Sequence, residues 1–348
     1  MNRPKVYIIL LNYNRWTDTI ECLESVLRNN YPNHQVVVVD NNSLDNSMEY
    51  LKAWAEGKLD VWVNPKNPLR SLSFPPIPKP IPYVYYTKEE AEKGKNLKLE
   101  KNVKNQIVLI QSSYNGGFSY GNNIGIKYAL SKNDFEYVWL LNNDTVIEES
   151  SLLKLVEKAQ NYKRLGKKIG IIGSKIFYYD NSELLNGIGG KYNKWFGVSS
   201  HIGAFEKDLG QYDNEDIIKK IDYIMGASMF VSKDFIKDVG LMNEDYFLYY
   251  EEVDWCIRGK RKGYNLGYCW NSRVYHKEGK TISSTFKGSK RSKTPDYYHI
   301  RNRIIFTKKF YRKYLPFVYV GLLITLFNRI KRLQFKRIKF ILEAITKA

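Results

Sequence analysis

The stretch YVWLLNNDT, residues 137–145, contains the pattern that decides the fold. Tyr137 to Leu141 is an unbroken run of apolar and aromatic residues, which predicts a buried strand. The run stops at Asn142, Asn143 and Asp144, so two amides and a carboxylate follow a core strand. Open α/β sheets bind ligands at the carboxyl ends of their strands, but the same residue types are also typical of a turn. Both interpretations stay open for this stretch taken alone.

Two strand patterns nearer the N-terminus also end in polar residues. An apolar strand at 6–11 is followed by Asn12 and Asn14, and a β-branched strand at 35–39 is followed by Asp40, Asn41 and Asn42. A helical pattern follows each, and the first helix is expected to begin at Asp18 with Glu21 completing a capping box. Alternating strands and helices predict a Rossmann-like opening of an α/β domain. Since a GxGxxG loop is missing, a dinucleotide cofactor is not expected.

A glycine-rich block, NGGFSYGNN at 115–123, follows a further strand at 106–110. Glycine lets the backbone approach a ligand closely, and amide side chains can bond to sugar or base edges. Between these segments, residues 65–105 contain seven of the eleven prolines, all between Pro65 and Pro82. This segment is expected to be an extended surface excursion, with a lid or an acceptor loop as the alternative.

A second polar cluster lies in FLYYEEVDWC, residues 247–256. Glu251, Glu252 and Asp254 directly follow an aromatic run and begin a helical pattern, so they could simply cap that helix. Partial burial beside aromatic rings would also raise the pKa of a carboxylate, which suits a general base. A strand-like run at 265–274 then leads to His276, one of four histidines, which could equally be an ordinary surface residue. An additional strand is expected at 221–231, with a break at Gly226, Ala227 and Ser228.

Taken together, these blocks resemble family 2 glycosyltransferases, in particular the bacterial rhamnosyltransferase-like branch. The resemblance rests on six motifs in the family's order, over roughly residues 5 to 280: LNYNRWTDTIECLESVL, VVVVDNNSLDNS, YNGGFSYGNNIGI, VWLLNNDTVI, MGASMFV and YFLYYEEVDWCIR. It implies an α/β GT-A fold, with a Rossmann-like mixed sheet flanked by helices, over residues 1–280 that include the 65–105 insertion. It also implies inverting transfer of a sugar from a nucleotide-diphosphate donor, dTDP-rhamnose or a UDP-sugar, to a glycan or lipid-linked glycan in cell-surface polysaccharide synthesis.

The resemblance also implies roles for particular residues. Asp144 would hold a divalent cation, Mg²⁺ or Mn²⁺, with His276 as a further ligand, because carboxylate and phosphate oxygens are hard ligands. Glu252 stands at the position of the family's catalytic Asp, and Glu251 beside it is the alternative base. The nucleotide sugar would contact Asn12, Asn14, Asp40, Asn41, Asn42, Asn115, Gly117, Asn123, Asn142 and Asn143. The acceptor side would include Gly226, Ala227, Asp254 and Trp255.

The net charge of +19 is concentrated in the C-terminal region, 281–348. Residues 301–348 carry 13 Lys and Arg against one acidic residue, a net of +12. The apolar run at 315–327 has 13 residues, fewer than the roughly 20 that span a membrane. These features predict basic amphipathic helices on an anionic membrane surface, or an extension that packs on the body or on a partner subunit, as in a homodimer.

The expected location is the cytoplasm, at the inner face of the cell membrane, since the N-terminal apolar run is too short for a signal peptide. Three cysteines without CxxC spacing fit a reducing compartment. Two other functions remain as alternatives. A nucleic-acid-binding protein could use the basic tail, but the chain has no recognised motif for nucleic acid, which is not an expected partner. A sugar nucleotidyltransferase would need a lysine-containing phosphate loop, which LNYNR does not provide.

Overall fold

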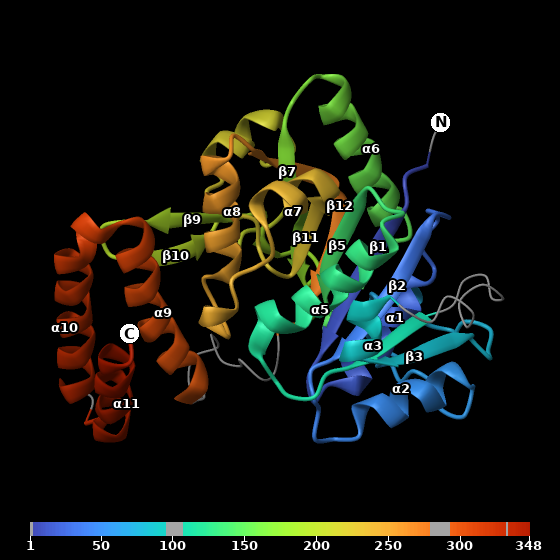
Figure 1. Ribbon diagram of the computed structural model, residues 1–348, viewed down its shortest axis with the longest axis horizontal. Helices are drawn as coiled ribbons and strands as arrows, with labels where there is room; N and C mark the ends of the chain where they lie inside the picture. Colours follow the sequence, from blue (N-terminus) through green and yellow to red (C-terminus); the bar gives the residue numbers. More distant parts are fainter. Residues whose placement is uncertain (1–2, 95–106, 279–292, 332) are drawn as a thin grey trace.

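A mixed β-sheet runs through the body of the protein in the computed structural model, which describes residues 3–94, 107–278, 293–331 and 333–348 (Figure 1). Among these residues its strands lie in the order β3-β4-β2-β1-β5-β11-β7-β12-β6, with β8 beside β7. The strands are β1 (Val6–Asn12), β2 (His34–Asp40), β3 (Tyr83–Thr87), β4 (Ile107–Gln111), β5 (Tyr137–Asn142), β6 (Thr145–Ile147), β7 (Ile169–Tyr178), β8 (Leu185–Gly187), β11 (Ser228–Ser232) and β12 (Asn265–His276). Strands β3, β4, β2, β1 and β5 are parallel, whereas β11 is antiparallel to both of its neighbours. The carboxyl ends of the parallel strands therefore share one edge.

Helices cover both faces of the sheet. Helices α1 (Trp16–Val26), α2 (Ser47–Ala55) and α6 (Ser151–Arg164) pack on one face, and α3 (Lys88–Lys93), α5 (Gly117–Lys132), α7 (Lys233–Val239) and α8 (Glu251–Arg261) pack on the other. Strand β5 shows why its sequence is apolar throughout: Val138 and Leu140 enter one core while Trp139 and Leu141 enter the other. The predicted buried strand is confirmed, because a strand covered on both faces has no polar side.

Two local expectations are wrong. Helix α1 begins at Trp16, and within the described chain no side chain caps it. Glu21 instead accepts hydrogen bonds from Lys277 Nζ and Tyr179 Oη, at 2.6 Å each, so a tertiary partner overrides the capping pattern. Only the C-terminal part of the strand expected at 221–231 forms, as β11 (Ser228–Ser232). The residues before it form a loop that ends at the small residues Gly226 and Ala227.

The segment 65–105 is partly built into the fold. It contains η1 (Arg70–Leu72), strand β3 and helix α3, and β3 pairs in parallel with β4 at the sheet edge. The expectation of an extended surface excursion is therefore wrong for residues 83–93, while 95–105 lie outside the described residues. The stretch after β7 holds β8 and a separate hairpin, β9 (Gly190–Asn193) with β10 (Val198–His201). That hairpin extends towards the C-terminal helices (Figure 1).

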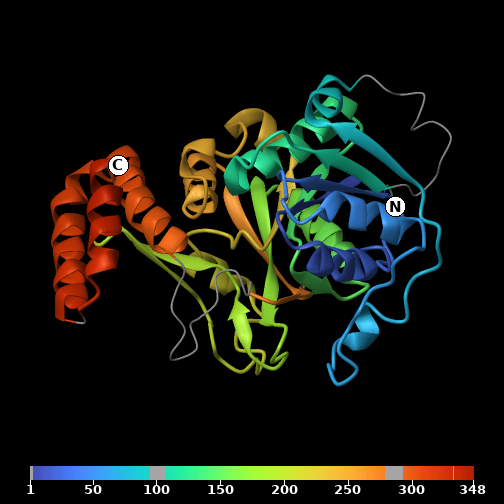
Figure 2. The ribbon, with the colours of Figure 1, turned by 90° about the horizontal axis from the view of Figure 1, so that it is seen from below.

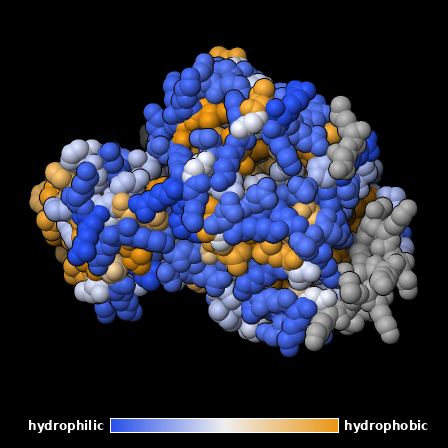
Figure 3. Space-filling model, turned by 45° about the horizontal axis from the view of Figure 1, so that its top comes forward, coloured by the Kyte–Doolittle hydropathy of each residue, from blue (hydrophilic) through white to orange (hydrophobic). Residues whose placement is uncertain are grey.

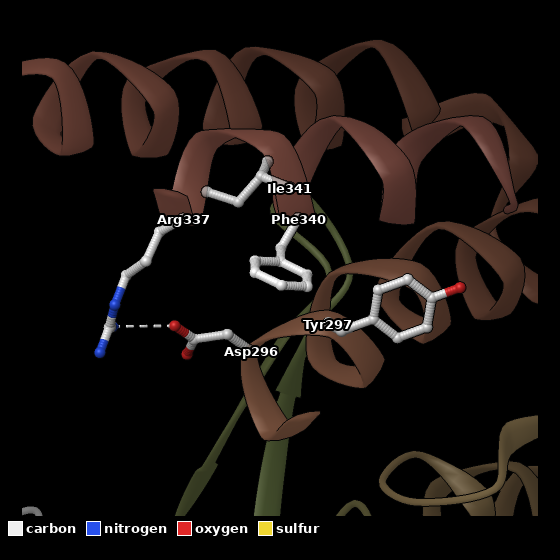
Figure 4. Close-up of a pocket in the computed structure, with 5 residues that line it drawn as sticks. All are labelled: Asp296, Tyr297, Arg337, Phe340 and Ile341. Atoms are coloured by element: carbon white, nitrogen blue, oxygen red, sulfur yellow. Dashed lines mark hydrogen bonds and ion pairs between the residues drawn. The ribbon is translucent and has the colours of Figure 1, made fainter. Parts of the chain in front are cut away.

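Three helices form a unit at one end of the molecule (Figure 2). They are α9 (Lys293–Phe310), α10 (Leu315–Lys331) and α11 (Phe335–Thr346), with η4 (Arg312–Tyr314) between the first two. Asp296 of α9 and Arg337 of α11 form an ion pair of 2.9 Å beside a small hollow (Figure 4). Helix α9 also belongs to the body, because Phe306 is fully buried in the core that contains α5 and α8. In the part of the chain described, we find no helix long and apolar enough to cross a membrane.

Candidate active site

Polar residues from four adjacent strands meet at the carboxyl edge of the sheet. Asn12 is in register with Asp40, Asp40 with Gln111, and Leu11 with Asn142. Parallel pairing therefore brings the strand ends that the sequence separates by tens of residues into one row. This is the edge at which open α/β sheets bind ligands.

Asn12 and Asn143 tie the first and fifth strands together at this edge. Asn12 Oδ1 accepts hydrogen bonds from Thr19 Oγ1 at 2.8 Å and from Asn143 Nδ2 at 3.3 Å. Asn143 Nδ2 also donates to Thr19 Oγ1 at 2.8 Å. These amides fix the loop after β5 against the start of α1. Thr19 was not expected at this edge. It lies in a helix seven residues after Asn12, and the sequence contains no local pattern that links the two residues.

Asp40 organises the neighbouring loop. Its Oδ1 accepts from Asn12 Nδ2 and Ser43 Oγ, at 2.6 Å each, and its Oδ2 accepts from Gln111 Nε2 at 2.8 Å and Ser43 N at 3.0 Å. The side chain is 1% exposed, so protein donors already occupy both oxygens. Asp40 therefore holds this loop in place, and the direct nucleotide contact expected for it stays a prediction. Asn14 is part of that loop, because Asn14 N donates to Ser43 Oγ at 2.8 Å.

Asn41 connects this loop to the glycine-rich block. Asn41 Nδ2 donates to Asn115 Oδ1 at 2.8 Å and to the carbonyl oxygen of Gly117 at 3.1 Å. Among the described residues, the buried Oδ1 of Asn41 has no hydrogen-bond partner. The next residue, Asn42, has a positive φ of 60° and is partly exposed at the edge. A buried acceptor without a partner is costly, so this oxygen is a candidate for a ligand hydroxyl or amide.

Gly117 is required by the backbone. Its φ is +88°, and a Cβ atom there would lie 2.2 Å from the carbonyl oxygen of Phe247. Phe118 N donates to that same oxygen at 2.7 Å, so the glycine-rich block contacts the loop before α8. Asn123 has a different role from the donor contact expected: it is buried, and its Nδ2 donates to Met242 O at 2.9 Å and Glu244 Oε1 at 2.8 Å. It anchors the segment that leads to this loop.

Asp144 and His276 meet beside the end of β5. Antiparallel pairing of β6 with β12 places His276 opposite Thr145, and His276 Nε2 lies 3.1 Å from Asp144 Oδ1. Asn142 Nδ2 lies 3.4 Å from the same ring nitrogen, and Asn186 Oδ1 lies 3.3 Å from Nδ1 on the other side of the ring. Burial lowers the pKa of His276, but the Asp144 carboxylate outweighs it and the pKa is raised overall. The two residues expected to bind one cation therefore lie side by side, while their role as metal ligands stays a prediction.

The two side chains supply part of the set of ligands that a divalent cation needs. A carboxylate oxygen and an imidazole nitrogen are both ligands of Mn²⁺ and similar ions. Among the described residues, however, no group of three or more His, Cys, Asp and Glu side chains is placed to hold a metal. A cation at Asp144 and His276 would therefore depend on oxygens from a bound ligand, as Mg²⁺ commonly does with substrate phosphates.

The two glutamates begin helix α8, and they differ in exposure. Glu251 is 4% exposed, and within the described residues its Oε2 has no hydrogen-bond partner. Burial and the charge of Glu252 raise the pKa of Glu251 well above its usual value. Glu252 is only partly buried, and this burial raises its pKa to about 7. Glu252 is therefore the more accessible of the two and is poised to exchange a proton near neutral pH.

Tyr223 is close enough to Glu252, and His201 to His276, for each charge to affect the pKa of its neighbour. Burial, with the charge of Glu252, raises the pKa of the Tyr223 phenol, and its ring centroid is 6.5 Å from that of His201. Local desolvation and the charge of His276 lower the pKa of His201, although the residue as a whole is exposed at the end of β10. Neither residue was expected near these clusters: Tyr223 falls in the strand expected at 221–231, and His201 lies in a segment for which no element was expected.

Asp254 and Trp255 do not belong to the accessible site. Both are 0% exposed. The Asp254 carboxylate accepts from Arg258 Nε at 2.5 Å, Lys309 Nζ at 2.6 Å and Tyr246 Oη at 3.0 Å. Trp255 packs on Phe235 and donates to a backbone carbonyl. The acceptor-side roles expected for them are therefore corrected to structural ones, because both side chains are buried among protein partners.

Gly226 and Ala227 lie at the strand end next to β5. Ala227 O accepts a hydrogen bond from Asn142 N at 3.1 Å, so this pair of small residues adjoins the Asn142 end of β5. Gly226 is partly exposed, and a Cβ atom there would approach no atom closer than the Phe118 ring at 3.5 Å among the described residues. Because Gly226 and Ala227 are small, they leave space beside Asn142 at the carboxyl edge of the sheet.

Solved structures with a similar fold define the class of this protein. A mannosyltransferase of Pyrobaculum calidifontis, PcManGT, solved with GDP-Man and Mn²⁺, superposes with a TM-score of 0.52 at 11% identity, over 100% of this chain and 87% of that one. GalNAc-T7, solved with UDP, GalNAc and Mn²⁺, gives a TM-score of 0.56 at 14% identity, over 91% of this chain and 50% of that one. The fold is thus the GT-A glycosyltransferase fold that the sequence predicted.

The sequence comparisons narrow this class to a family. The model of glycosyl transferase family 2 matches residues 7–69 and 86–208, more than half of the chain. The low-salt glycan biosynthesis hexosyltransferase Agl10 of Haloferax volcanii is 26% identical over 244 residues, covering 69% of this chain and 73% of that protein. The rhamnosyltransferase WbbL of Escherichia coli K12 is 25% identical over 206 residues, covering 56% of this chain and 75% of that protein. The chain belongs to glycosyltransferase family 2, and it is an enzyme that uses a nucleotide-sugar donor.

Proposed function

We propose that this protein is an inverting, metal-dependent glycosyltransferase whose donor lies along the carboxyl edge of β4, β2, β1 and β5. The observation that carries the proposal is the pair Asp144 and His276, 3.1 Å apart, at the end of the central strand. A divalent cation bound there would neutralise charge that develops on the leaving diphosphate. Solved structures of this fold contain Mn²⁺, which favours Mn²⁺ or Mg²⁺ as the ion.

Glu252 is the proposed general base. It is more accessible than Glu251, and its raised pKa lets it accept a proton near neutral pH. The base takes the proton of the acceptor hydroxyl as the oxygen attacks the anomeric carbon from the face opposite the diphosphate. A new glycosidic bond forms as the bond to the diphosphate breaks, so the anomeric configuration inverts.

The donor is proposed to be dTDP-rhamnose or a UDP-sugar, and the acceptor a hydroxyl of a glycan or lipid-linked glycan in polysaccharide synthesis. Similarity to a rhamnosyltransferase and to a glycan-biosynthesis hexosyltransferase supports this choice. Screening dTDP-rhamnose, UDP-glucose, UDP-GlcNAc and GDP-mannose for Mn²⁺-dependent nucleotide release tests the donor. Release from none of them would contradict the proposal, and the anomeric configuration of the product, read by NMR, tests inversion.

The C-terminal unit is proposed to attach the enzyme to an anionic membrane surface, at the cytoplasmic face. Buried Val318 and Leu322 turn one face of α10 to its neighbours, while apolar side chains stay exposed on the opposite face. We name this surface the α10 apolar face; its residues are Phe317, Val320, Leu323, Ile324, Phe327 and Ile330. Figure 3 shows apolar side chains gathered at this end of the molecule.

Exposed cations flank α10 along the chain: Arg312 and Lys313 precede it, Lys331 ends it, and Lys339 lies on α11. Apolar side chains beside basic ones match a bilayer surface with anionic headgroups. A second copy of the chain could also cover the apolar face as a homodimer, but the surrounding positive charge would then oppose its own copy. The positive charge therefore favours an anionic membrane over a second copy of the chain as the partner of the α10 apolar face.

A further inference from the structure

The loop Tyr246–Tyr250, which we call the base loop, leads directly into Glu251 and Glu252 and has an unusual backbone. Phe247, Tyr249 and Tyr250 have φ values of 62°, 72° and 76°. Large L-residues rarely adopt a positive φ, because Cβ then crowds the backbone. Such a conformation persists only where its surroundings hold it in place.

Helix α9 supplies much of what holds the base loop. Asn302 is 0% exposed, and its Nδ2 lies within hydrogen-bond distance of three loop carbonyls. It donates to the carbonyl oxygens of Tyr246 at 2.7 Å, Leu248 at 2.8 Å and Tyr249 at 3.1 Å. One amide group, with one of its two N–H groups shared, thus bonds to three carbonyls of the irregular loop, of which the loop itself pairs Tyr246 O, with Leu248 N at 2.7 Å.

Ring stacking on α9 supports the same loop. The rings of Tyr249 and His299 have centroids 3.9 Å apart with an interplanar angle of 18°. The rings of Phe247 and Tyr298 have centroids 4.7 Å apart with an angle of 17°. Aromatic pairs of this kind fix the direction of a side chain as well as burying it.

The opposite side of the base loop contacts the donor edge. Phe118 N donates to Phe247 O at 2.7 Å, and Gly117 leaves the space that this approach needs. The base loop is therefore held between the glycine-rich block of the catalytic body and a helix of the basic C-terminal region. A shift of α9 would move the loop, and with it the first turn of α8.

We propose that Asn302 is a positioning residue, which fixes the base loop and thereby directs the carboxylate of Glu252 towards the acceptor hydroxyl. This rests on the proposed function, in which Glu252 is the base. It assigns α9 to the active site, although α9 lies in the region for which only membrane attachment or packing on the body or a partner was expected. Asn302 acts through Glu252 and has no role in the donor site.

The test compares four variants of the full-length protein: Asn302→Ala, Asn302→Asp, Glu252→Gln and the double variant Asn302→Ala/Glu252→Gln. Asn302→Asp keeps the shape of the side chain but removes both N–H donors. Turnover is followed as nucleotide release from the donor that is active in the screen, and UDP and dTDP binding is measured by calorimetry. Asn328→Ala, at an exposed asparagine of α10, is the matched control.

Both Asn302 variants should lower kcat by about 10²-fold while KM for the donor and nucleotide affinity change less than about threefold. The double variant should be no slower than Glu252→Gln, because Asn302 acts only through that residue. Amide hydrogen exchange in residues 247–250 should become about tenfold faster in Asn302→Ala, while exchange in the central strands of the sheet stays slow. This last measurement does not depend on turnover.

Other results would overturn the proposal in distinguishable ways. The positioning role would be ruled out if hydrogen exchange in residues 247–250 were unchanged in Asn302→Ala. It would also be ruled out if Asn302→Ala kept its kcat while Glu252→Gln was inactive. In both cases the proposed function would still stand. Additive losses in the double variant would show that Asn302 acts on general stability instead. An active Glu252→Gln would contradict the base assignment itself.

Discussion

His276 Nε2 lies 3.1 Å from Asp144 Oδ1, although the two residues come from strands far apart in the sequence. The contact follows from the antiparallel pairing of β6 with β12, which sets His276 opposite Thr145. Both side chains are mostly buried, so the pair is preformed at the sheet edge. A preformed pair loses little conformational freedom on binding a cation.

Removing either member of this pair should weaken metal-dependent turnover. Asp144→Ala should abolish turnover that EDTA inhibits, while His276→Ala should raise the Mn²⁺ concentration for half-maximal rate by about 10–100-fold. Titration of Mn²⁺ into the EDTA-treated enzyme measures both effects. Asp134→Ala, which changes a carboxylate at the opposite end of β5, is the control and should titrate like the wild type. Full activity of the wild type in excess EDTA would rule out the cation.

Removing the proposed base should lower kcat without weakening the binding of the nucleotide. Glu252→Gln should lose about 10²–10⁴-fold in kcat and retain nucleotide affinity, since the amide keeps the shape but cannot accept the proton. Glu251→Gln is the matched comparison and should lose much less, because that side chain is 4% exposed. The reverse pattern in steady-state kinetics would assign the base to Glu251.

The pH dependence of kcat should show an acid limb. The base must be ionised, and burial raises the pKa of Glu252 to about 7, so kcat should rise with pH up to about 7 and then level off. Measurement at saturating Mn²⁺ separates this limb from protonation of His276. A flat profile between pH 5 and 8 would be inconsistent with a carboxylate base of raised pKa.

Glycine at position 117 should be needed for stability and for rate. In Gly117→Ala the left-handed backbone costs about 1–2 kcal/mol, and the contact with Phe247 O adds about 1–3 kcal/mol. Gly166→Ala is a matched control, because Gly166 also has a positive φ of 67° but no described atom lies within 4 Å of a Cβ there. Urea unfolding measures the difference between the two. Equal losses of stability in the two variants would mean that the base loop can move away from a Cβ atom at position 117 without a measurable cost in free energy.

The α10 apolar face should bind anionic vesicles. The triple variant Leu323→Glu/Phe327→Glu/Ile330→Glu should lower affinity for phosphatidylglycerol-containing vesicles at least tenfold, because it replaces buried apolar contact by like-charge repulsion. Co-sedimentation measures binding, and Leu209→Glu, at an exposed leucine elsewhere, is the control. Deletion of residues 311–348 should likewise release the protein. A variant that loses self-association in ultracentrifugation but keeps its vesicle affinity would identify a dimer interface instead.

Strand patterns and their polar ends could be predicted from the sequence, because apolar runs and turn residues are local signals. They located β1, β2 and β5, together with Asp144 and His276. Other assignments failed where a distant partner decides the outcome. Glu21 looked like a helix cap until Lys277 and Tyr179 were placed beside it. Asn123 and Asp254 likewise have the right residue types but face buried partners.

The residues that complete the site had weaker signals. Tyr223 and His201 come from loop and hairpin segments without clear periodicity, so only the folded chain shows their neighbours. The positive φ values of the base loop could not be predicted, since its residues are aromatic rather than glycine. Asn302 lies in a basic helix whose charge drew attention to a membrane rather than to catalysis.

Helix α9 also determines how this enzyme can be divided and recombined. Because Phe306 is buried in the main core and Asn302 bonds to the base loop, residues 293–310 cannot be exchanged together with α10 and α11. A chimaera that borrows the attachment helices of a related enzyme should be joined after Phe310, near Tyr311. A junction placed at residue 280 would instead transplant a foreign helix against the catalytic loop, and the hybrid would lose its rate even if it reached the correct surface.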